Sequence, residues 1–185
     1  MTPAADPSSA PSPWIARWAH LIPAGARVLD VAAGQGRHAR YLAERGGRVM
    51  AVDRDADALA AVAGVPGIET RVADLEAGAW PLGGETFDAI VVVRYLHRPL
   101  LPHLLAALSG DGVLLYETFA VGNEAFGRPT NPVFLLRRDE LLQAVHQHLS
   151  VIAFEQGRVD GERPAVVQRL AAIGRDAAWP SRLAP

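Results

Sequence analysis

The chain contains no cysteine, and all 18 of its basic residues other than histidine are arginine, because lysine is absent as well. Without cysteine there can be no disulfides, thiolate metal sites or cysteine nucleophiles. Without lysine there can be no Schiff base and no P-loop lysine. No apolar run approaches the ~20 residues that span a bilayer, and the first residues have neither the basic region nor the apolar core of a signal peptide. We therefore expect a cytoplasmic protein without a membrane segment.

The length of 185 residues suits one domain with a real core. A formal net charge of −2 gives no general attraction to nucleic acid or anionic lipid, so a small-molecule partner is favoured and nucleic acid is not. The six histidines show no spacing with an acid that suits a metal, and we expect none. We predict a flexible tail over residues 1–12, one domain over 13–175 and a second tail over 176–185. The oligomeric state is not legible in the sequence.

The stretch from Arg27 to Arg40, RVLDVAAGQGRHAR, organises the rest of the chain. A short apolar strand breaks at a glycine turn and resumes as a helix expected over Arg37–Glu44. Gly34 and Gly36 let the backbone approach a ligand with no Cβ in the way, and the helix start offers unpaired N–H groups. This order is the opening of a nucleotide-binding βαβ unit, although the same glycines also fit the dinucleotide pattern.

Asp30, four residues before Gly34, helps to distinguish a dinucleotide site from a site for a nucleoside ligand without phosphate. A carboxylate at the end of the strand would repel a pyrophosphate in a partly desolvated site, whereas it would attract a cation. S-adenosylmethionine carries an ammonium and a sulfonium and has no phosphate. The run D-V-A-A-G-Q-G therefore resembles the first motif of the class I, Rossmann-like methyltransferases, with Ala32 where that family often has its first glycine.

Hydrophobic periodicity predicts an alternation of strands and helices. We expect helices over Pro13–Ile22, Arg37–Glu44, Ala56–Val62, Leu100–Leu108 and Arg137–His148, and strands around Val28–Val31, Arg48–Val52, Gly67–Val72, Phe87–Val93, Val113–Phe119, Leu149–Glu155 and Ala165–Ile173. The last two strands read as an antiparallel hairpin, which the sheet of the resembled family has. The fold prediction is a single-domain α/β, Rossmann-like sheet, mostly parallel with a C-terminal antiparallel hairpin and with helices on both faces.

Acidic residues follow the ends of successive strands. Asp53 ends the second strand, where its carboxylate reaches a ribose; its alternative role as a helix N-cap can pass to Asp55. The resemblance implies that Asp74 accepts from the adenine amine and that Leu75 packs on the ring, although Asp74 also suits an ordinary exposed loop. The predicted cofactor is S-adenosylmethionine, bound by Asp30, Ala32, Gly34, Gly36, Asp53, Arg54, Asp74, Leu75 and Arg94.

The turn Arg94–Pro99 and the loop Ala120–Leu135 leave the same edge of the predicted sheet, where open α/β sheets bind ligands. If the acceptor must lose a proton, His97 or Glu117 is the candidate base, with Tyr95 or Tyr116 orienting the acceptor. His97 could equally cap the neighbouring helix. If Arg94, Arg98 and Arg128 converge at this edge, they would favour an anionic acceptor. The candidate acceptor-binding residues are Arg98, Tyr116, Asn123, Phe126 and Arg128.

The methyltransferase resemblance covers roughly Val28–Ile173, and the segments YLHRPLLPHLL and YETFAVGNEAFGRPTNPVFLL are similar to the small bacterial tellurite-resistance-type branch. It implies in-line methyl transfer to a small acceptor, for which alignment in a dry site matters most. Two alternatives stay open. One is a noncatalytic methyltransferase-like module that binds the cofactor or a partner. The other is an NAD-dependent oxidoreductase, which could not use a Tyr-x-x-x-Lys pair in a chain without lysine.

Overall fold

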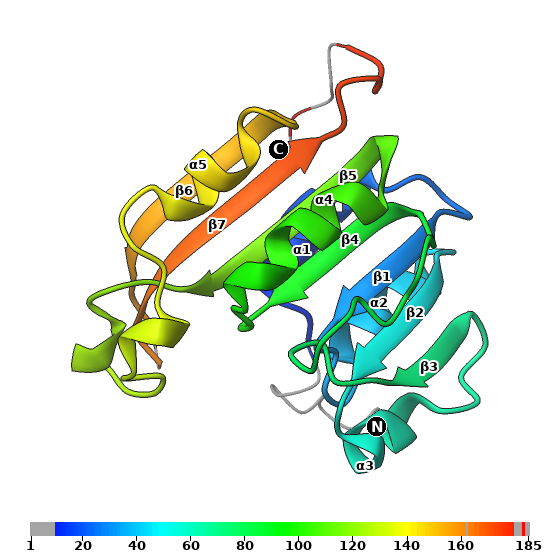
Figure 1. The fold of residues 1–185 in the computed structure, drawn as a ribbon, viewed down its shortest axis with the longest axis horizontal. Coiled ribbons are helices and arrows are strands. Elements are labelled where there is room, and N and C mark those ends of the chain that lie inside the picture. Colours follow the sequence, from blue (N-terminus) through cyan, green and yellow to red (C-terminus); the bar gives the residue numbers. More distant parts are fainter. Residues whose placement is uncertain (1–9, 162, 180–182, 184–185) are drawn as a thin grey trace, which may run out of the picture.

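The computed structural model describes residues 10–161, 163–179 and 183, and its centre is one seven-stranded sheet (Figure 1). The strand order is β3-β2-β1-β4-β5-β7-β6. The strands are β1 (Arg27–Val31), β2 (Arg48–Asp53), β3 (Ile68–Val72), β4 (Phe87–Val93), β5 (Leu108–Phe119), β6 (Ser150–Val159) and β7 (Ala165–Ile173). The helices are α1 (Pro13–Trp18), α2 (Arg37–Glu44), α3 (Ala56–Leu59), α4 (Leu101–Ala107) and α5 (Glu140–Val145), with the 3-10 turns η1 (Ala19–Leu21), η2 (Ala60–Val62), η3 (Arg98–Leu100), η4 (Asn123–Ala125) and η5 (Pro132–Phe134).

Strand β1 lies at the point where the strand order reverses. It pairs in parallel with β2 on one side and with β4 on the other, so that Asp30 lies opposite both Ala51 and Val91. Strands β1 and β4 are buried almost throughout because both faces of this part of the sheet are covered. In open α/β sheets the carboxyl ends of the strands at such a reversal form the ligand crevice, and this is where the glycine turn leaves β1.

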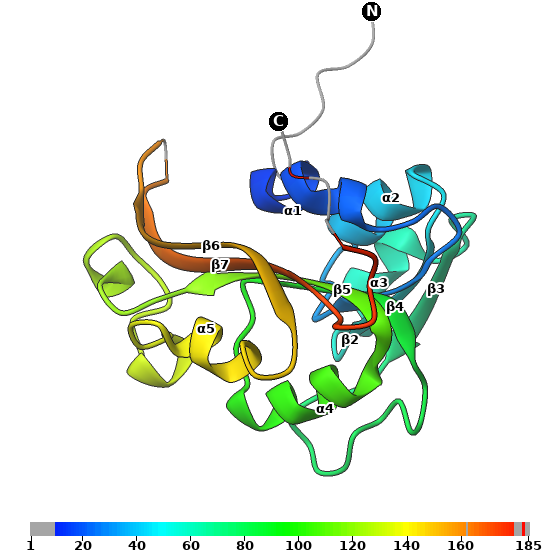
Figure 2. The same cartoon turned by 90° about the horizontal axis from the view of Figure 1, so that it is seen from above.

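Helices cover both faces of the sheet, as predicted (Figure 2). The face of α1, α2 and α3 encloses one apolar cluster, and the face of α4 and α5 encloses the other. Trp14 and Trp18 are buried in the first cluster with ring centroids 5.7 Å apart, so both tryptophans pack in the core. Ser12 caps α1 by accepting from the Trp14 N–H, and Pro13 occupies the first helical position.

The C-terminal hairpin is antiparallel, which confirms the fold prediction: β7 pairs with both β5 and β6. Strand β5 begins at Leu108 and not at the predicted Val113. Its first residues resemble a turn in sequence, but the chain beyond β7 pairs with them: the Gly174 N–H donates to the Gly112 carbonyl at 2.7 Å, and the Asp176 N–H donates to the Gly110 carbonyl at 3.0 Å. The start of the predicted C-terminal tail is thereby attached to the sheet.

Helix α5 is shorter than the predicted helix over Arg137–His148. Asp139, just before it, has a φ of 61°, a left-handed conformation that cannot continue a helix backwards. The Arg137 carbonyl accepts instead from the Gln168 side chain at 2.6 Å. In the part of the chain that the structure describes, no helix is long and apolar enough to cross a membrane.

Candidate cofactor and acceptor site

The turn after β1 adopts left-handed backbone conformations at Ala32, Gly34 and Gly36, with φ values of 52°, 54° and 69°. Gly36 is required sterically, because a Cβ there would lie 2.6 Å from the Val62 side chain. A Cβ at Gly34 would meet nothing within 4 Å, so the turn is open at that residue. Ala32 has a Cβ and adopts the same left-handed conformation, which costs such a residue about 1 kcal/mol or more of conformational free energy.

The Asp53 carboxylate joins the tip of β2 to this turn. Its Oδ2 atom accepts from the Gly34 N–H at 2.7 Å, and its Oδ1 atom accepts from the Asp55 N–H at 2.9 Å. The Asp53 carbonyl also accepts from the Ala73 N–H at 2.9 Å, just beyond β3. Asp55 caps α3 through the Ala58 N–H, so Asp53 does not have to. One residue thus links the carboxyl ends of three strands.

Asp30 lies beneath the turn, with only 1% of its surface exposed. Burial raises the pKa of its carboxyl to about 7, although the Ala39 N–H, which donates to it at 2.9 Å, and the Arg37 guanidinium oppose the shift. The side chain therefore acts on the site by holding the start of α2, and a ligand would meet the backbone above it.

Two arginines share a charged cluster with Asp30. Arg37 follows Gly36 directly and is half-buried; burial and the charge of Arg94 lower its pKa, while Glu117 and Asp30 raise it. Arg94 has a φ of 57° and donates its backbone N–H to the Glu117 carbonyl at 2.8 Å. Arg37 was not among the predicted site residues. Its place at the first position of the helix after a glycine turn is the signal that could have identified it.

Ser12 clamps the start of α1 against this cluster. Its backbone N–H donates to His38 Nε2 at 3.1 Å, and its hydroxyl donates to Glu117 Oε2 at 3.1 Å. Arg169 pairs with the same carboxylate oxygen at 2.9 Å. Burial, followed by the charges of Arg37 and Arg94, lowers the pKa of His38 to about 3, so the ring is a neutral acceptor. Ser12, which the sequence placed in a flexible tail, is buried here.

The network changes the interpretation of Glu117. Its carboxylate, predicted as a candidate base, is 8% exposed and holds Ser12 and Arg169. Both partners contact Oε2, so this carboxylate has a structural role in holding the start of α1 and the Arg169 side chain in place. His97 stands at the N-cap position of η3, where its backbone carbonyl accepts from the Leu100 N–H at 3.0 Å, but its side chain makes no capping hydrogen bond.

The remaining predicted cofactor residues border one part of the sheet edge. The Asp74 carboxylate accepts from the Glu76 N–H at 2.8 Å, and Leu75 packs half-buried against the core. Burial, then the Glu76 and Asp74 carboxylates, raise the pKa of Tyr95 above its usual value, while the Arg54 guanidinium opposes the shift. The Tyr95 hydroxyl is buried, yet among the described residues it finds no hydrogen-bond partner of normal geometry.

The structure replaces the predicted acceptor role of Arg98 with a structural one. Its guanidinium donates to both oxygens of Glu140, at 2.6 and 3.0 Å, and to the carbonyls of Val133 and Leu135, at 2.6 and 2.9 Å. Every nitrogen of the group is therefore engaged, and Arg98 is not available to hold an anion.

Two further candidates are corrected for a similar reason. Tyr116 is 1% exposed in the core, and its hydroxyl donates to the Tyr95 carbonyl at 3.0 Å. Asn123 is 2% exposed and fastens its loop to β7 by accepting from the Val166 N–H at 3.2 Å. Both side chains therefore hold the structure together and do not face the proposed acceptor.

A cavity of about 190 Å³ opens where β4 and β5 end, and the loop after β5 closes one side of it. We call it the acceptor cavity; it is lined by Glu76, Arg94, Tyr95, Leu96, Thr118, Phe119, Pro129 and Phe134. Arg94 and Tyr95 were predicted site residues, whereas Glu76, next to Asp74 and Leu75, was missed. Phe126 lies outside this lining, under the Arg158 guanidinium at 4.9 Å from its ring centroid, and Arg128 is exposed.

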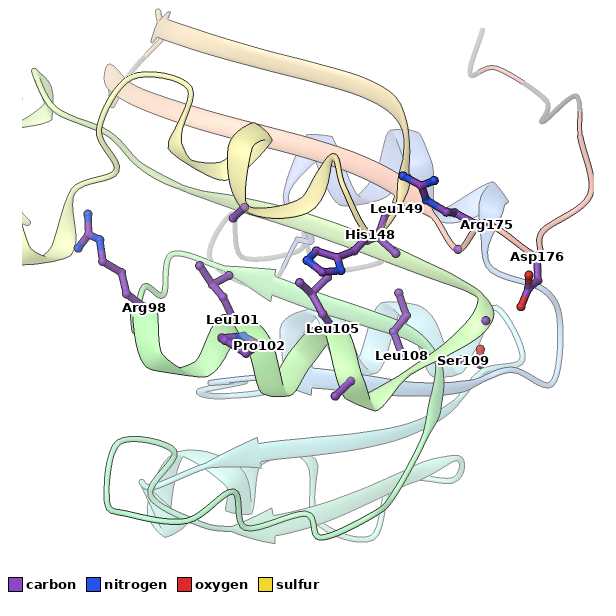
Figure 3. Close-up of a pocket in the computed structure, with 14 residues that line it drawn as sticks. Arg98, Leu101, Pro102, Leu105, Leu108, Ser109, His148, Leu149, Arg175 and Asp176 are labelled. Atoms are coloured by element: carbon purple, nitrogen blue, oxygen red, sulfur yellow. The ribbon is translucent and has the colours of Figure 1, made fainter.

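A larger groove of about 740 Å³ runs along α4 (Figure 3). Leu101 and Leu105 of α4 lie on one side of it, and His148, beyond α5, lies on the other. Arg98 lies at one end and Asp176 at the other. Of the predicted site residues only Arg98 lines it, so the groove is separate from the residues gathered around the glycine turn.

Comparisons with known proteins relate the sequence and the fold to methyltransferases. Residues 28–110 match the family model of a methyltransferase domain. No curated protein matches the chain. Among solved structures, TehB from Haemophilus influenzae superimposes with a TM-score of 0.71 at 18% identity over 85% of this chain, which spans only 60% of that protein. A TehB-like methyltransferase dependent on S-adenosylmethionine (SAM), from Corynebacterium glutamicum, gives 0.61 at 23% identity over 85% of this chain and 86% of its own.

A third similar structure is the 1,6-didemethyltoxoflavin-N1-methyltransferase of Burkholderia thailandensis, which holds 1,6-didemethyltoxoflavin and S-adenosylhomocysteine. It gives a TM-score of 0.62 at 22% identity over 87% of this chain and 76% of its own. At these identities the structures establish the fold. With the family match they confirm the predicted resemblance. The chain is thus similar to a methyltransferase domain over residues 28–110, and it shares the Rossmann-like fold of the TehB-type structures.

Proposed function

We propose that the chain transfers the methyl group of S-adenosylmethionine to a small-molecule acceptor. The observation that carries the proposal is the pair of hydrogen bonds by which Asp53 holds both the Gly34 N–H and the Asp55 N–H. They keep a carboxylate at the tip of β2 beside an open turn at the end of β1, the position at which a sugar hydroxyl is bound in nucleotide folds.

The chemistry of the residues fits this cofactor better than a dinucleotide. The turn has no Cβ at Gly34 and open space beside it, so the backbone is accessible to a ligand. Asp53 and Asp74 are acids at the tips of β2 and β3, suited to hydroxyl and amine donors. Arg37 and Arg94 are the two cations of the cluster, and they suit the carboxylate of an amino acid.

Each residue has a positioning task in this proposal. Bound S-adenosylmethionine would supply a methyl group on a sulfonium. Gly34 and Asp53 would hold the ribose portion, Asp74 and Leu75 the adenine, and Arg37 with Arg94 the carboxylate. Ser12 and Glu117 fix the start of α1 over the cluster and so restrict water there. In-line transfer needs alignment and a dry site more than it needs acid–base chemistry.

An anionic acceptor has less support than the sequence suggested. Arg98 is fully engaged by Glu140 and two carbonyls, and Arg128 does not line the acceptor cavity. Arg94 is then the one predicted arginine beside the cavity, and it is also needed by the cofactor in the scheme above. We retain a small acceptor as the proposal and take up its charge below.

The test is release of S-adenosylhomocysteine when the purified chain is incubated with S-adenosylmethionine and a panel of small hydroxyl, amine and oxyanion acceptors. Turnover with any of them supports the proposal. Cofactor binding without turnover on the whole panel would favour a noncatalytic module. Binding of NADH in place of S-adenosylmethionine would favour an oxidoreductase.

A further inference from the structure

We infer that the acceptor is an uncharged, single-ring compound with a hydroxyl or an N–H group, bound in the acceptor cavity with its proton directed to Glu76. The inference rests on the proposed function and adds the class of substrate. It follows from the size of the cavity, the nature of its walls and the balance of charge around it.

The cavity has room for one ring. Its volume is about 190 Å³, whereas pockets for drug-sized ligands start at about 300 Å³ and an engineered apolar cavity of about 150 Å³ is known to bind benzene. A single six-membered ring with a small polar substituent therefore fits, and a nucleotide or a peptide segment does not.

The walls are mostly apolar. Leu96, Phe119, Pro129 and Phe134 supply apolar surface, and the Tyr95 ring adds an aromatic face. Walls of this kind favour a flat, weakly hydrated ligand, because aromatic rings gain from offset or edge-to-face contact with one another. An oxyanion would lose part of its hydration against these apolar walls.

The lining charges cancel. Arg94 is its one cation and Glu76 its one anion, and Thr118 is neutral. Arg98, the nearest arginine in the sequence, is engaged by Glu140. An anionic acceptor would gain from Arg94 but would be repelled by Glu76, so the cavity offers it no net attraction. A neutral acceptor with one donor group has a partner in the Glu76 carboxylate.

Among the apolar residues that line the cavity, Phe134 has a large exposed surface that a ligand could cover. It is 45% exposed although it lies beside the cavity, and its neighbour Val133, which does not line the cavity, is 62% exposed. A ring in the cavity would cover part of the Phe134 side chain and remove apolar surface from water. The pair therefore offers a wall residue and a matched control on the same short turn, η5.

The reaction on such an acceptor balances with the residues present. The acceptor oxygen or nitrogen forms a bond to the methyl carbon, the carbon–sulfur bond breaks, and its electron pair remains on sulfur. The acceptor releases one proton, which the Glu76 carboxylate takes up at the cavity wall. The Tyr95 hydroxyl, which lies close to the Glu76 carboxylate, is a further donor for the acceptor heteroatom.

The experiment compares ring acceptors with anions on the full chain. Phenol and aniline are the neutral probes, and benzoate and inorganic selenite are the anionic ones. Methylation is followed with radiolabelled S-adenosylmethionine, and cofactor binding is measured separately by calorimetry. The variants are Phe134→Ala and Glu76→Gln, with Val133→Ala as the control.

The inference predicts kcat/KM for a neutral ring acceptor above that for either anion. Phe134→Ala should raise KM for that acceptor by about tenfold, as expected for loss of one apolar wall, with Val133→Ala unchanged and cofactor affinity unchanged in both. Glu76→Gln should lower kcat and shift its pH profile. Three outcomes would overturn the inference while cofactor binding keeps the cofactor assignment standing. They are methylation of the anions alone, methylation of none of the probes, and methylation of a ring acceptor with a KM that Phe134→Ala does not change. Absence of cofactor binding would instead overturn the proposed function on which it rests.

Discussion

The Gly34 N–H donates a 2.7 Å hydrogen bond to the Asp53 carboxylate, and this bond ties the turn after β1 to the tip of β2. The two residues are 19 positions apart, and the parallel register of β1 and β2 brings them together. The second Asp53 oxygen is held by the Asp55 N–H. Both ends of the proposed ribose site are thus fixed before a ligand arrives, which lowers the ordering cost of binding.

Ala32→Gly should stabilise the fold. Ala32 holds a φ of 52°, which glycine adopts without the Cβ penalty. We expect the free energy of unfolding to rise by about 0.5–1 kcal/mol, because the relief of strain exceeds the greater chain entropy of glycine in the unfolded state. Thermal unfolding measures the change.

Ala33→Gly is the matched control, since Ala33 is the next residue, is buried and is not among the residues with positive φ. It should lower the free energy of unfolding by about 0.5–1 kcal/mol. Equal destabilisation by the two substitutions would show that Ala32 carries no backbone strain.

Asp30 and His38 should give the stability of the protein opposing pH dependences. The folded-state pKa of Asp30 is raised from 3.8 to about 7, so between these pH values the folded chain keeps a proton that the unfolded chain releases, and stability falls as pH rises. The folded-state pKa of His38 is lowered from 6.5 to about 3, so between those values the unfolded chain binds the extra proton, and stability rises with pH. The two slopes offset each other over their shared range.

Single substitutions should reveal each slope. Relative to wild type, Asp30→Asn should make stability rise more steeply between pH 4 and 6, and His38→Gln should make it fall, each by up to about 1.4 kcal/mol per pH unit. Both replacements keep an oxygen to accept the bond from Ala39 or Ser12. Urea unfolding at several pH values measures this, and three parallel profiles would refute it.

Arg98 and Glu140 should be energetically coupled. Burial raises the pKa of Glu140, but hydrogen bonds from Arg98 and Arg137 outweigh it and lower the pKa to about 2. The pair holds η3 to the first residue of α5, so Arg98→Ala and Glu140→Gln should each destabilise the fold, and a double-mutant cycle should give a coupling of about 1–3 kcal/mol. Additive effects together with a raised KM for an anionic acceptor would instead restore Arg98 to the acceptor site.

The strands of the sheet could be predicted because the hydrophobic pattern of each strand lies within a few consecutive residues. Apolar runs such as Ala89–Val93 indicated buried parallel strands, and the predicted bounds Ala165–Ile173 agree with those of β7. Asp55 was the predicted alternative cap for α3, and it is the cap in the structure. These features depend on residues close together in the sequence, so residue type and spacing are enough to predict them.

The acceptor side could not be predicted in the same way, because its contacts are distant in sequence. Arg98 and Glu140 are 42 positions apart, and Ser12 and Glu117 are 105 apart. A charged residue at the ligand edge looks the same in sequence whether it faces a ligand or a partner across the fold. Glu76 was missed for the converse reason, since only the folded loop brings it beside Arg94 and Phe134.

Calorimetric titration with S-adenosylmethionine tests the central claim most directly. The chain should bind it with micromolar affinity and should not bind NADH. Asp53→Ala should weaken binding at least tenfold, about 1.4 kcal/mol, while Asp55→Ala, which removes only the α3 cap, should leave the affinity unchanged in a folded protein. Binding of NADH without S-adenosylmethionine, or equal cofactor affinity in the wild type and Asp53→Ala, would contradict the account.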